Sequence, residues 1–350
     1  MSLQYIFGGS GAGKSTYLYN SIIKESIKNP LENYIIVVPE QYTMATQKRV
    51  VELHPRKGVL NIDVVSFERL AYKVFEEVGA ADYPVLDDTG KNLIVRRVLE
   101  QNKRALRFFG SNISNTGFVS ELKSVISEML QYDISVDKLL DINKNVDNNS
   151  LLGMKLDDIS LIYGGFREFI KNNYITSEEI LDLMCRKVTE SSKIRGSVIA
   201  FDGFTGFTPV QYRLMAILLD MCKEVKVALT IDISEHVNIN EGIESLFYMT
   251  KDTVAHLNRI CDEGHINVDK VTVGEDTVLT RFAASKELEF LEKNIFRPGL
   301  RYYSGKVNDI VMYAGITPKD EIQYVSGELL TLTSLQGVRD NEISGLRSRI

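Results

Sequence analysis

The sequence predicts an α/β fold, in which a doubly wound parallel sheet carries helices on both faces. Short apolar runs rich in β-branched residues alternate with segments of helical periodicity along much of the chain. The first of these runs leads directly into a glycine-rich stretch, FGGSGAGKSTYLY, which opens an amphipathic helix. The length of 350 residues suits two or three domains, and 44% hydrophobic with 25% charged residues is typical of a globular protein.

Five buried strands are expected from the apolar runs. They lie at residues 3–7, 34–39, 61–67, 196–204 and 224–232. A helix is expected from about Lys14 to Ile27, directly after the glycines. Between residues 88 and 193 helical patterns dominate, and strand patterns are nearly absent. After about residue 235 the chain is polar and mostly helical, until strand character returns at 308–315 before a last amphipathic helix.

This pattern divides the chain into three expected parts. Residues 1–87 and 194–300 form a P-loop α/β domain, and residues 88–193 form an all-helical insertion within it. Residues 301–350 form the start of a second α/β domain. One strand and one helix cannot bury a core alone, so we expect this second domain to be truncated.

Composition and charge exclude several classes of function. A net charge of −6 argues against a protein that coats DNA through general basic charge, although it is compatible with a local basic groove. The three cysteines lie far apart and the four histidines lack metal-ligand spacing, so neither a disulfide framework nor a zinc site is expected. No apolar run approaches the roughly 18 residues of a membrane span and no signal peptide is evident, so we expect a cytoplasmic protein without membrane contact.

The glycine-rich stretch matches the phosphate-binding pattern Gly-x-x-x-x-Gly-Lys-Ser between a strand and a helix. Its glycines let successive backbone N–H groups face a phosphate, and the helix N-terminus adds the positive end of its dipole. Lys14 would reach the β- and γ-phosphates of ATP, and the Ser15 hydroxyl would bind Mg²⁺. The expected nucleotide-binding residues are Gly8, Gly9, Ser10, Gly11, Ala12, Gly13, Lys14, Ser15 and Thr16.

A P-loop enzyme also needs an acidic residue at the end of another strand to hold magnesium, and usually a glutamate to activate water. Asp202 ends the apolar run VIAF and is the candidate for a weak magnesium contact together with Ser15. Gly203 stands where many ATPases have the glutamate, and FTGFTPVQYR after it contains no carboxylate. The sequence therefore supports nucleotide binding better than hydrolysis, and no catalytic residue is expected.

Polar and aromatic residues follow three of the expected strands, at the edge where parallel strands end and ligands bind. Aromatic faces can stack on the bases of single-stranded DNA, and Arg or Gln can hydrogen-bond base edges. Phe67 also lies at helical spacing with Leu70 and Val74, so a place in the core is the alternative for it, and one of Phe204 and Phe207 has the same alternative. The expected DNA-binding residues are Gln41, Thr43, Phe67, Arg69, Tyr72, Phe204 and Phe207.

These segments together resemble the superfamily 1 helicase core. GGSGAGKST is similar to its Walker A motif, VVPEQYTMATQKR to motif Ia, and VIAFDGFTGFTPVQ to motif II. At a closer level, GGSGAGKST, VVPEQ-x-T, SFxRLAYxVF, DGFxxFTPxQ and DEIxxVxxEL resemble the AddB (RexB) family in order and spacing. This family comprises the B subunits of AddAB-type helicase–nucleases, and the resemblance covers essentially the whole chain.

The resemblance implies a helicase-like subunit without motor activity, in a complex with an AddA-type subunit that carries the working helicase. Such complexes process DNA double-strand breaks for recombination, and the B subunit scans the emerging single strand for a Chi sequence. The matching positions for Chi contacts are the DNA-binding residues named above, although many relatives have Trp where Tyr72 stands. The family's nuclease domain and iron–sulfur cluster are expected only in a C-terminal part that this sequence lacks, so it would be the N-terminal part of such a subunit.

Two other functions are compatible with a P-loop. One is an active ATPase or DNA helicase, which differs from the first interpretation in turning over ATP on single-stranded DNA. The other is a small-molecule kinase, which the helical insertion and the absence of an arginine cluster make the weaker alternative.

Overall fold

The structure is a computed structural model of the chain. It describes residues 1–58, 60–79, 84–113, 115–147, 149–171, 174–232, 235–237, 242–274, 282, 284–297 and 299–334. By compactness the chain divides into two units, Met1–Arg281 and Phe282–Ile350. This division falls earlier in the chain than the boundary expected at residue 300.

The first unit is built on a parallel sheet of six strands in the order β3-β2-β6-β7-β1-β8. The strands are β1 (Ser2–Gly8), β2 (Tyr34–Val37), β3 (Ile62–Val65), β6 (Val198–Phe201), β7 (Glu224–Thr230) and β8 (Asn267–Thr272). The five expected strands are all present. Since β1 lies between β7 and β8, the first strand of the chain occupies an interior position and its carboxyl end opens at the edge where ligands bind.

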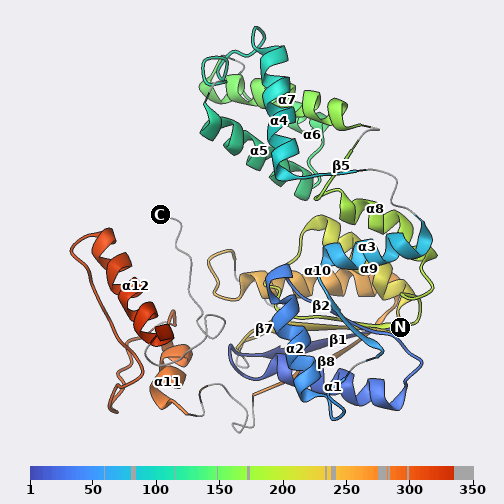
Figure 1. The fold of residues 1–350 in the computed structure, drawn as a ribbon, viewed down its shortest axis with the longest axis vertical. Helices are drawn as coiled ribbons and strands as arrows, with labels where there is room; N and C mark the ends of the chain where they lie inside the picture. Colours follow the sequence, from blue (N-terminus) through green and yellow to red (C-terminus); the bar gives the residue numbers. More distant parts are fainter. Residues whose placement is uncertain are drawn as a thin grey trace. The chain divides into compact units, whose positions relative to one another are not determined.

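Helices cover both faces of this sheet (Figure 1). On one face, α1 (Lys14–Lys28) and α2 (Thr43–Leu53) contribute buried residues to a core with β1, β2 and β6. On the other face, a larger core holds residues of α3 (Phe67–Val78), α8 (Ile180–Lys187), α9 (Pro209–Met221) and α10 (Tyr248–Gly264). The chain therefore forms the doubly wound α/β arrangement that the sequence predicts.

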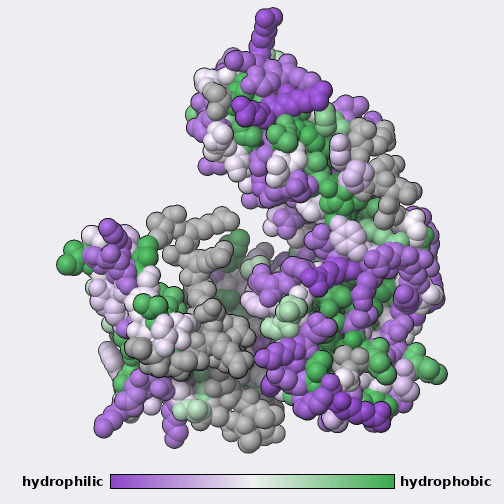
Figure 2. All heavy atoms as spheres, viewed as in Figure 1, coloured by the Kyte–Doolittle hydropathy of each residue, from purple (hydrophilic) through white to green (hydrophobic). Residues whose placement is uncertain are grey.

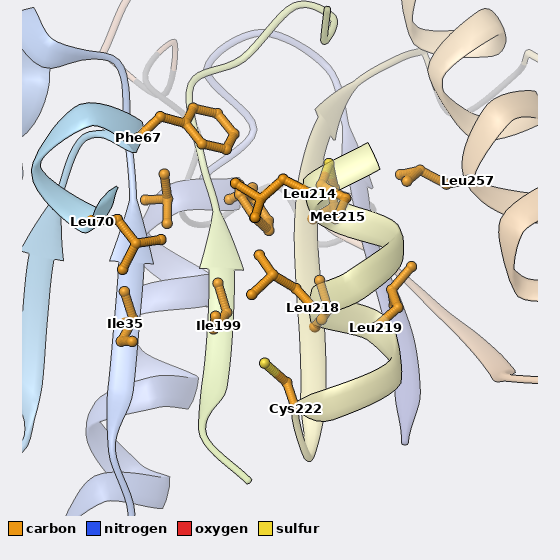
Figure 3. Close-up of a cluster of buried hydrophobic side chains, with 14 of the residues drawn as sticks. Ile35, Phe67, Leu70, Ile199, Leu214, Met215, Leu218, Leu219, Cys222 and Leu257 are labelled. Carbon is orange, nitrogen blue, oxygen red and sulfur yellow. The ribbon is translucent and has the colours of Figure 1, made fainter. Parts of the chain in front are cut away.

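The larger core explains why α9 forms where it does. Thr208 caps the helix through a reciprocal capping box with Gln211, and Pro209 occupies the first helical turn, where its missing N–H is harmless. Leu214 and Leu218 lie one turn apart and face the sheet near Ile199 (Figure 3). The three side chains are all fully buried, and such burial stabilises the fold by about 1.5–3 kcal/mol for each side chain.

A separate cluster of helices interrupts the α/β unit. It comprises α4 (Asp88–Asn102), α5 (Thr116–Gln131), α6 (Val136–Asn143) and α7 (Leu151–Ile170), and it has its own hydrophobic core between Leu86 and Ile170. A small parallel pair, β4 (Val85–Leu86) and β5 (Ile175–Thr176), joins its two ends, so the segment is not purely helical.

The last part of the expected insertion belongs elsewhere. Residues of α8 and of the short helix η2 (Val188–Glu190) are buried in the core of the α/β unit, against α3 and α9. The packing therefore ends the helical insertion before α8, earlier in the chain than the boundary expected at residue 193. The helical periodicity of α8 is the same in either location, which is why the sequence pattern does not distinguish them.

The described residues of the second unit contain two helices, α11 (Lys286–Asn294) and α12 (Pro318–Ser334). The strand expected at residues 308–315 is absent, because no neighbouring strand among the described residues 284–334 satisfies its backbone. Large apolar side chains stand exposed instead, among them Leu300, Met312 and Ile316, each at least 89% exposed. Figure 2 shows apolar side chains on the surface of this unit.

One strand of the six-stranded sheet was not expected. β8 lies in the region after residue 235 that the sequence predicts to be mostly helical. Its residues are exposed or half-buried on both faces, so it lacks the apolar run that marks the other strands. It forms because its backbone pairs along the length of β1, with Leu3 opposite Val268 and Phe7 opposite Thr272.

Glu77 joins the end of α3 to the loop before β6. Its carboxylate accepts hydrogen bonds from the hydroxyl and backbone N–H of Ser192 at 2.6 and 2.8 Å, and from the Ser191 hydroxyl. Burial opposes ionisation, but these hydrogen bonds outweigh it and lower the pKa of the Glu77 carboxyl to about 2. The ionised carboxylate is thus one of the groups that hold this loop in place.

We expect Glu77→Gln to lower the free energy of unfolding at pH 7 by about 1–2 kcal/mol, a value discounted for the partial exposure of the group. Because the pKa is lower in the folded state, the stabilisation is present above the ordinary pKa of 4.5 and is lost as the pH falls towards 2. Denaturant unfolding between pH 2 and 7 measures it. The exposed neighbour Glu76→Gln is the control, and an equal loss at pH 7 and pH 2 for Glu77→Gln would contradict the assignment.

Candidate functional site: a glycine-rich loop and the adjoining strand ends

The glycine-rich loop connects the end of β1 at Gly8 to the start of α1 at Lys14. Gly11 and Gly13 have φ values of 75° and 92°, a region that other residues enter only at a cost of about 1–2 kcal/mol. The Lys14 ammonium donates a hydrogen bond to the carbonyl of Gly9 at 2.8 Å, so the lysine folds back over the loop. The loop therefore presents backbone N–H groups, a lysine and a helix N-terminus together, which is the chemistry that binds phosphate.

Two residues after β8 form the rear wall of this loop, and the sequence pattern does not identify them. A Cβ at Gly8 would lie 2.5 Å from the carbonyl oxygen of Val273, which is a backbone atom that cannot move aside. A Cβ at Gly274, where φ is 108°, would lie 2.9 Å from the Cβ of Ala12. The first glycine of the motif is thus required by contact with distant backbone as well as by any ligand.

Asp202 lies at the end of β6, with one strand between it and β1. Its side chain is 6% exposed and accepts a hydrogen bond of 2.6 Å from the hydroxyl of Tyr19 on α1. Among the described residues, no group of three or more His, Cys, Asp or Glu could hold a metal ion. One oxygen of the carboxylate expected to bind magnesium is therefore already engaged by a phenol.

Gly203 follows with a φ of 80°, in the left-handed region. A glutamate at this position, as in a working ATPase, would strain the backbone there by about 1–2 kcal/mol. The left-handed backbone at position 203 therefore favours the glycine that the sequence has there over a glutamate.

The expected DNA-binding residues differ in accessibility. Gln41 and Arg69 are exposed, and the Arg69 guanidinium forms an ion pair of 3.2 Å with Glu40. Thr43 is buried and its hydroxyl donates to the Glu40 carbonyl at 2.9 Å, so it fixes the turn η1 (Glu40–Tyr42) that leads into α2. Of these three residues, Gln41 and Arg69 are the ones that a DNA strand could reach directly.

The aromatic residues form a cluster of their own, which we call the phenylalanine cluster. Its ring centroids lie 5.1–6.4 Å apart in tilted and edge-on arrangements, with the core residue Phe201 at its base. Phe67 is 7% exposed, so the core alternative for this residue is correct in this conformation, whereas Phe204 and Phe207 are half-buried. The members are Phe67, Phe201, Phe204 and Phe207.

A groove of about 380 Å³ opens beside Arg69 and Tyr72, between α2, β3 and α3. Tyr72 is half-buried and packs against the larger core, with its ring edge-on to Phe75. The groove is also lined by Gln47 and Lys73, which the sequence pattern does not single out, although both lie on the same helices as expected site residues. Lys73 forms an ion pair of 2.8 Å with Asp63 across the groove.

The structure brings the two expected sites to one edge of the sheet. Gly203 lies beside Pro39 and Tyr42, so the segments that follow β2 and β6 are in contact. Arg69 reaches Glu40, which links the segment after β3 to them. Tyr19 then joins Asp202 to the helix of the glycine-rich loop.

A helix long and apolar enough to cross a membrane is not found in the described part of the chain.

Fold and site define the chain as a parallel α/β protein with a glycine-rich loop at the carboxyl edge of its sheet. The family model "ADDB, N-terminal" matches residues 5–292. The chain belongs to the AddB family.

Curated relatives agree with this family. Proteins named as B subunits of an ATP-dependent helicase/deoxyribonuclease from Lachnoclostridium phytofermentans and Caldanaerobacter subterraneus are 41% and 32% identical to this chain. A protein of the same name from Clostridium novyi is 30% identical. Each match covers 98% of this chain but only 29–30% of the relative, so the chain spans less than a third of the length of these proteins.

Proposed function

We propose that this chain is the nucleotide-binding and DNA-binding part of a helicase-like subunit that has no motor activity of its own. The subunit would bind single-stranded DNA at a double-strand break and recognise a Chi sequence in it, for recombinational repair. The observation that carries the proposal is the edge of the sheet after β2, β3 and β6. There Gln41, Arg69 and the phenylalanine cluster lie at the same edge of the sheet as the glycine-rich loop, and Gly203 rather than a carboxylate follows Asp202.

The chemistry of this edge suits a single strand. The exposed Arg69 and Gln41 can donate hydrogen bonds to base edges and phosphates. The half-buried rings of Phe204 and Phe207, beside this edge of the sheet, offer faces on which DNA bases can stack. The ion pair between Arg69 and Glu40 is exposed on both sides, so a DNA phosphate could displace it at little cost.

Nucleotide binding without hydrolysis is part of the same proposal. ATP would place its phosphates against the backbone of the glycine-rich loop and the ammonium of Lys14. Gly203 supplies no base to activate water, and its left-handed backbone disfavours a glutamate there. No step of the proposal depends on magnesium held by Asp202.

Relatives are named as B subunits of a helicase/deoxyribonuclease, which supports a partner subunit for this chain as well. We propose that the partner is an AddA-type subunit that carries the motor. DNA cleavage and an iron–sulfur cluster would belong to a part of the protein outside these residues, since Cys222 and Cys261 are buried inside the α/β unit.

Alanine substitution of the exposed residues tests the DNA part. In the full-length complex, Arg69→Ala and Gln41→Ala are each expected to weaken binding to Chi-containing single strands by about 1–2 kcal/mol relative to scrambled strands. Fluorescence anisotropy with both strands measures the difference. Arg186→Ala, which removes an exposed arginine from α8, is the matched control.

Other outcomes assign other roles. An equal loss on every sequence would place both residues on the DNA backbone and contradict base recognition. DNA-stimulated ATP turnover of about 1 per second or faster, lost in Lys14→Ala of this subunit, would identify an active motor and overturn the proposal. Phosphate transfer to a metabolite without DNA affinity would identify a kinase instead.

A further inference from the structure

The hydroxyl of Tyr19 lies between the two residues expected to bind magnesium. Tyr19 follows Ser15 by one turn of α1, so the two side chains share a face of the helix. The phenol donates to the Asp202 carboxylate at 2.6 Å, and interactions with Ser15 and Thr46 act on the same hydroxyl. A side chain of the protein therefore occupies the path between the glycine-rich loop and the end of β6.

Tyr19 is held in this position by its surroundings. The side chain is 5% exposed and belongs to the core formed with α1 and β2. The 2.6 Å contact has the Tyr19 hydroxyl as donor and the Asp202 carboxylate as acceptor. Removing the hydroxyl would leave the buried carboxylate without this partner, which carries a free-energy penalty.

This arrangement differs from what magnesium requires. Magnesium prefers octahedral oxygen ligands and keeps several of its waters, so a carboxylate that serves it directs its oxygens at the metal or at those waters. Asp202 instead faces a phenol and is almost fully buried.

We propose that Tyr19 is a positioning residue whose hydroxyl joins α1, the helix after the glycine-rich loop, directly to Asp202. It would take the place of a magnesium ion bound between Ser15 and Asp202. The inference rests on nucleotide binding at this loop, as proposed above. Nucleotide would then bind without any contribution from metal on Asp202. The segment after Asp202, which enters the phenylalanine cluster, would be tied to α1 by the protein itself.

Metal dependence of ADP affinity tests this directly. Isothermal titration calorimetry on the full-length subunit compares ADP with excess Mg²⁺ and ADP with EDTA. We expect Asp202→Asn to leave the ratio of the two affinities unchanged. Tyr19→Phe should raise the Mg²⁺-dependent gain by about fivefold or more, and adding Asp202→Asn to Tyr19→Phe should remove that gain. If Asp202→Asn abolishes a Mg²⁺-dependent gain in the otherwise unaltered protein, the inference is wrong.

A second measurement needs no nucleotide. Thermal unfolding of the full-length subunit is compared for Tyr19→Phe, Asp202→Asn and the double variant, with Tyr17→Phe on the exposed side of α1 as control. Each single change at the pair should lower the unfolding midpoint, and the double variant should lose clearly less than the sum. Additive losses would overturn the inference. If the protein binds no ADP at all, the proposed nucleotide binding fails, while this cycle still decides whether the bond exists.

Discussion

Lys14→Ala is expected to weaken ATP and ADP binding by about 2–3 kcal/mol, which is roughly 30- to 150-fold. The ammonium now donates to the Gly9 carbonyl, and in the complex it would exchange this neutral acceptor for charged phosphate oxygens. Because the loop backbone and the helix N-terminus remain, some affinity should persist. Calorimetric titration of the full-length subunit measures the loss.

Lys24→Ala provides the matched control. Lys24 lies on the same helix with its side chain exposed, so it removes an equal charge without touching the loop. Its effect should be within about twofold of no change, since exposed charges at this distance are largely screened. Equal losses for the two variants would mean that ATP is not bound by the glycine-rich loop.

Phe201→Ala is expected to lower the free energy of unfolding by about 3–5 kcal/mol. The ring is fully buried and lies within 5.6–6.4 Å of the rings of Phe67, Phe204 and Phe207. Its removal leaves a cavity beneath the segment that follows Asp202, and the lost contacts of three rings add to the lost burial. Denaturant unfolding with an unchanged slope is the measurement.

Tyr132→Ala removes an aromatic ring that is 55% exposed and should change the unfolding free energy by less than about 0.5 kcal/mol. DNA binding gives a second readout for Phe201→Ala. If the phenylalanine cluster only fills the core, the variant should lose stability and retain DNA affinity when folded. If the cluster also shapes the DNA edge, affinity should fall with it.

Much of this fold follows from local pattern. The five buried strands are continuous apolar runs, so their position could be predicted, and the loop from Gly8 to Lys14 has a spacing that few other structures share. The exposure of Gln41 and Arg69 also agrees with their position just after strand ends. These features depend on residues close together in the chain.

The rest depends on contacts that pattern does not encode. β8 has no apolar run and exists through pairing with β1, more than 250 residues earlier. The bond between Tyr19 and Asp202 joins an ordinary helical tyrosine to a strand end, and neither residue alone predicts it. Residues 308–315 show the opposite case from β8. Their sequence is strand-like, but they form no strand, because no neighbouring strand among the described residues pairs with them.

The interior position of β1 has a consequence for how the protein is made. β1 is synthesised before the strands that pair with it, and its register is set by pairs such as Leu3 with Val225 and with Val268. At about 5–20 residues per second, the second of these partners is synthesised roughly 10–50 s after the first strand. Until β7 is synthesised, the strand Ser2–Gly8 has neither of its neighbouring strands, and its backbone N–H and C=O groups are unpaired. The glycine-rich loop is therefore among the last features of the α/β unit to take shape, although it precedes most of that unit in the chain.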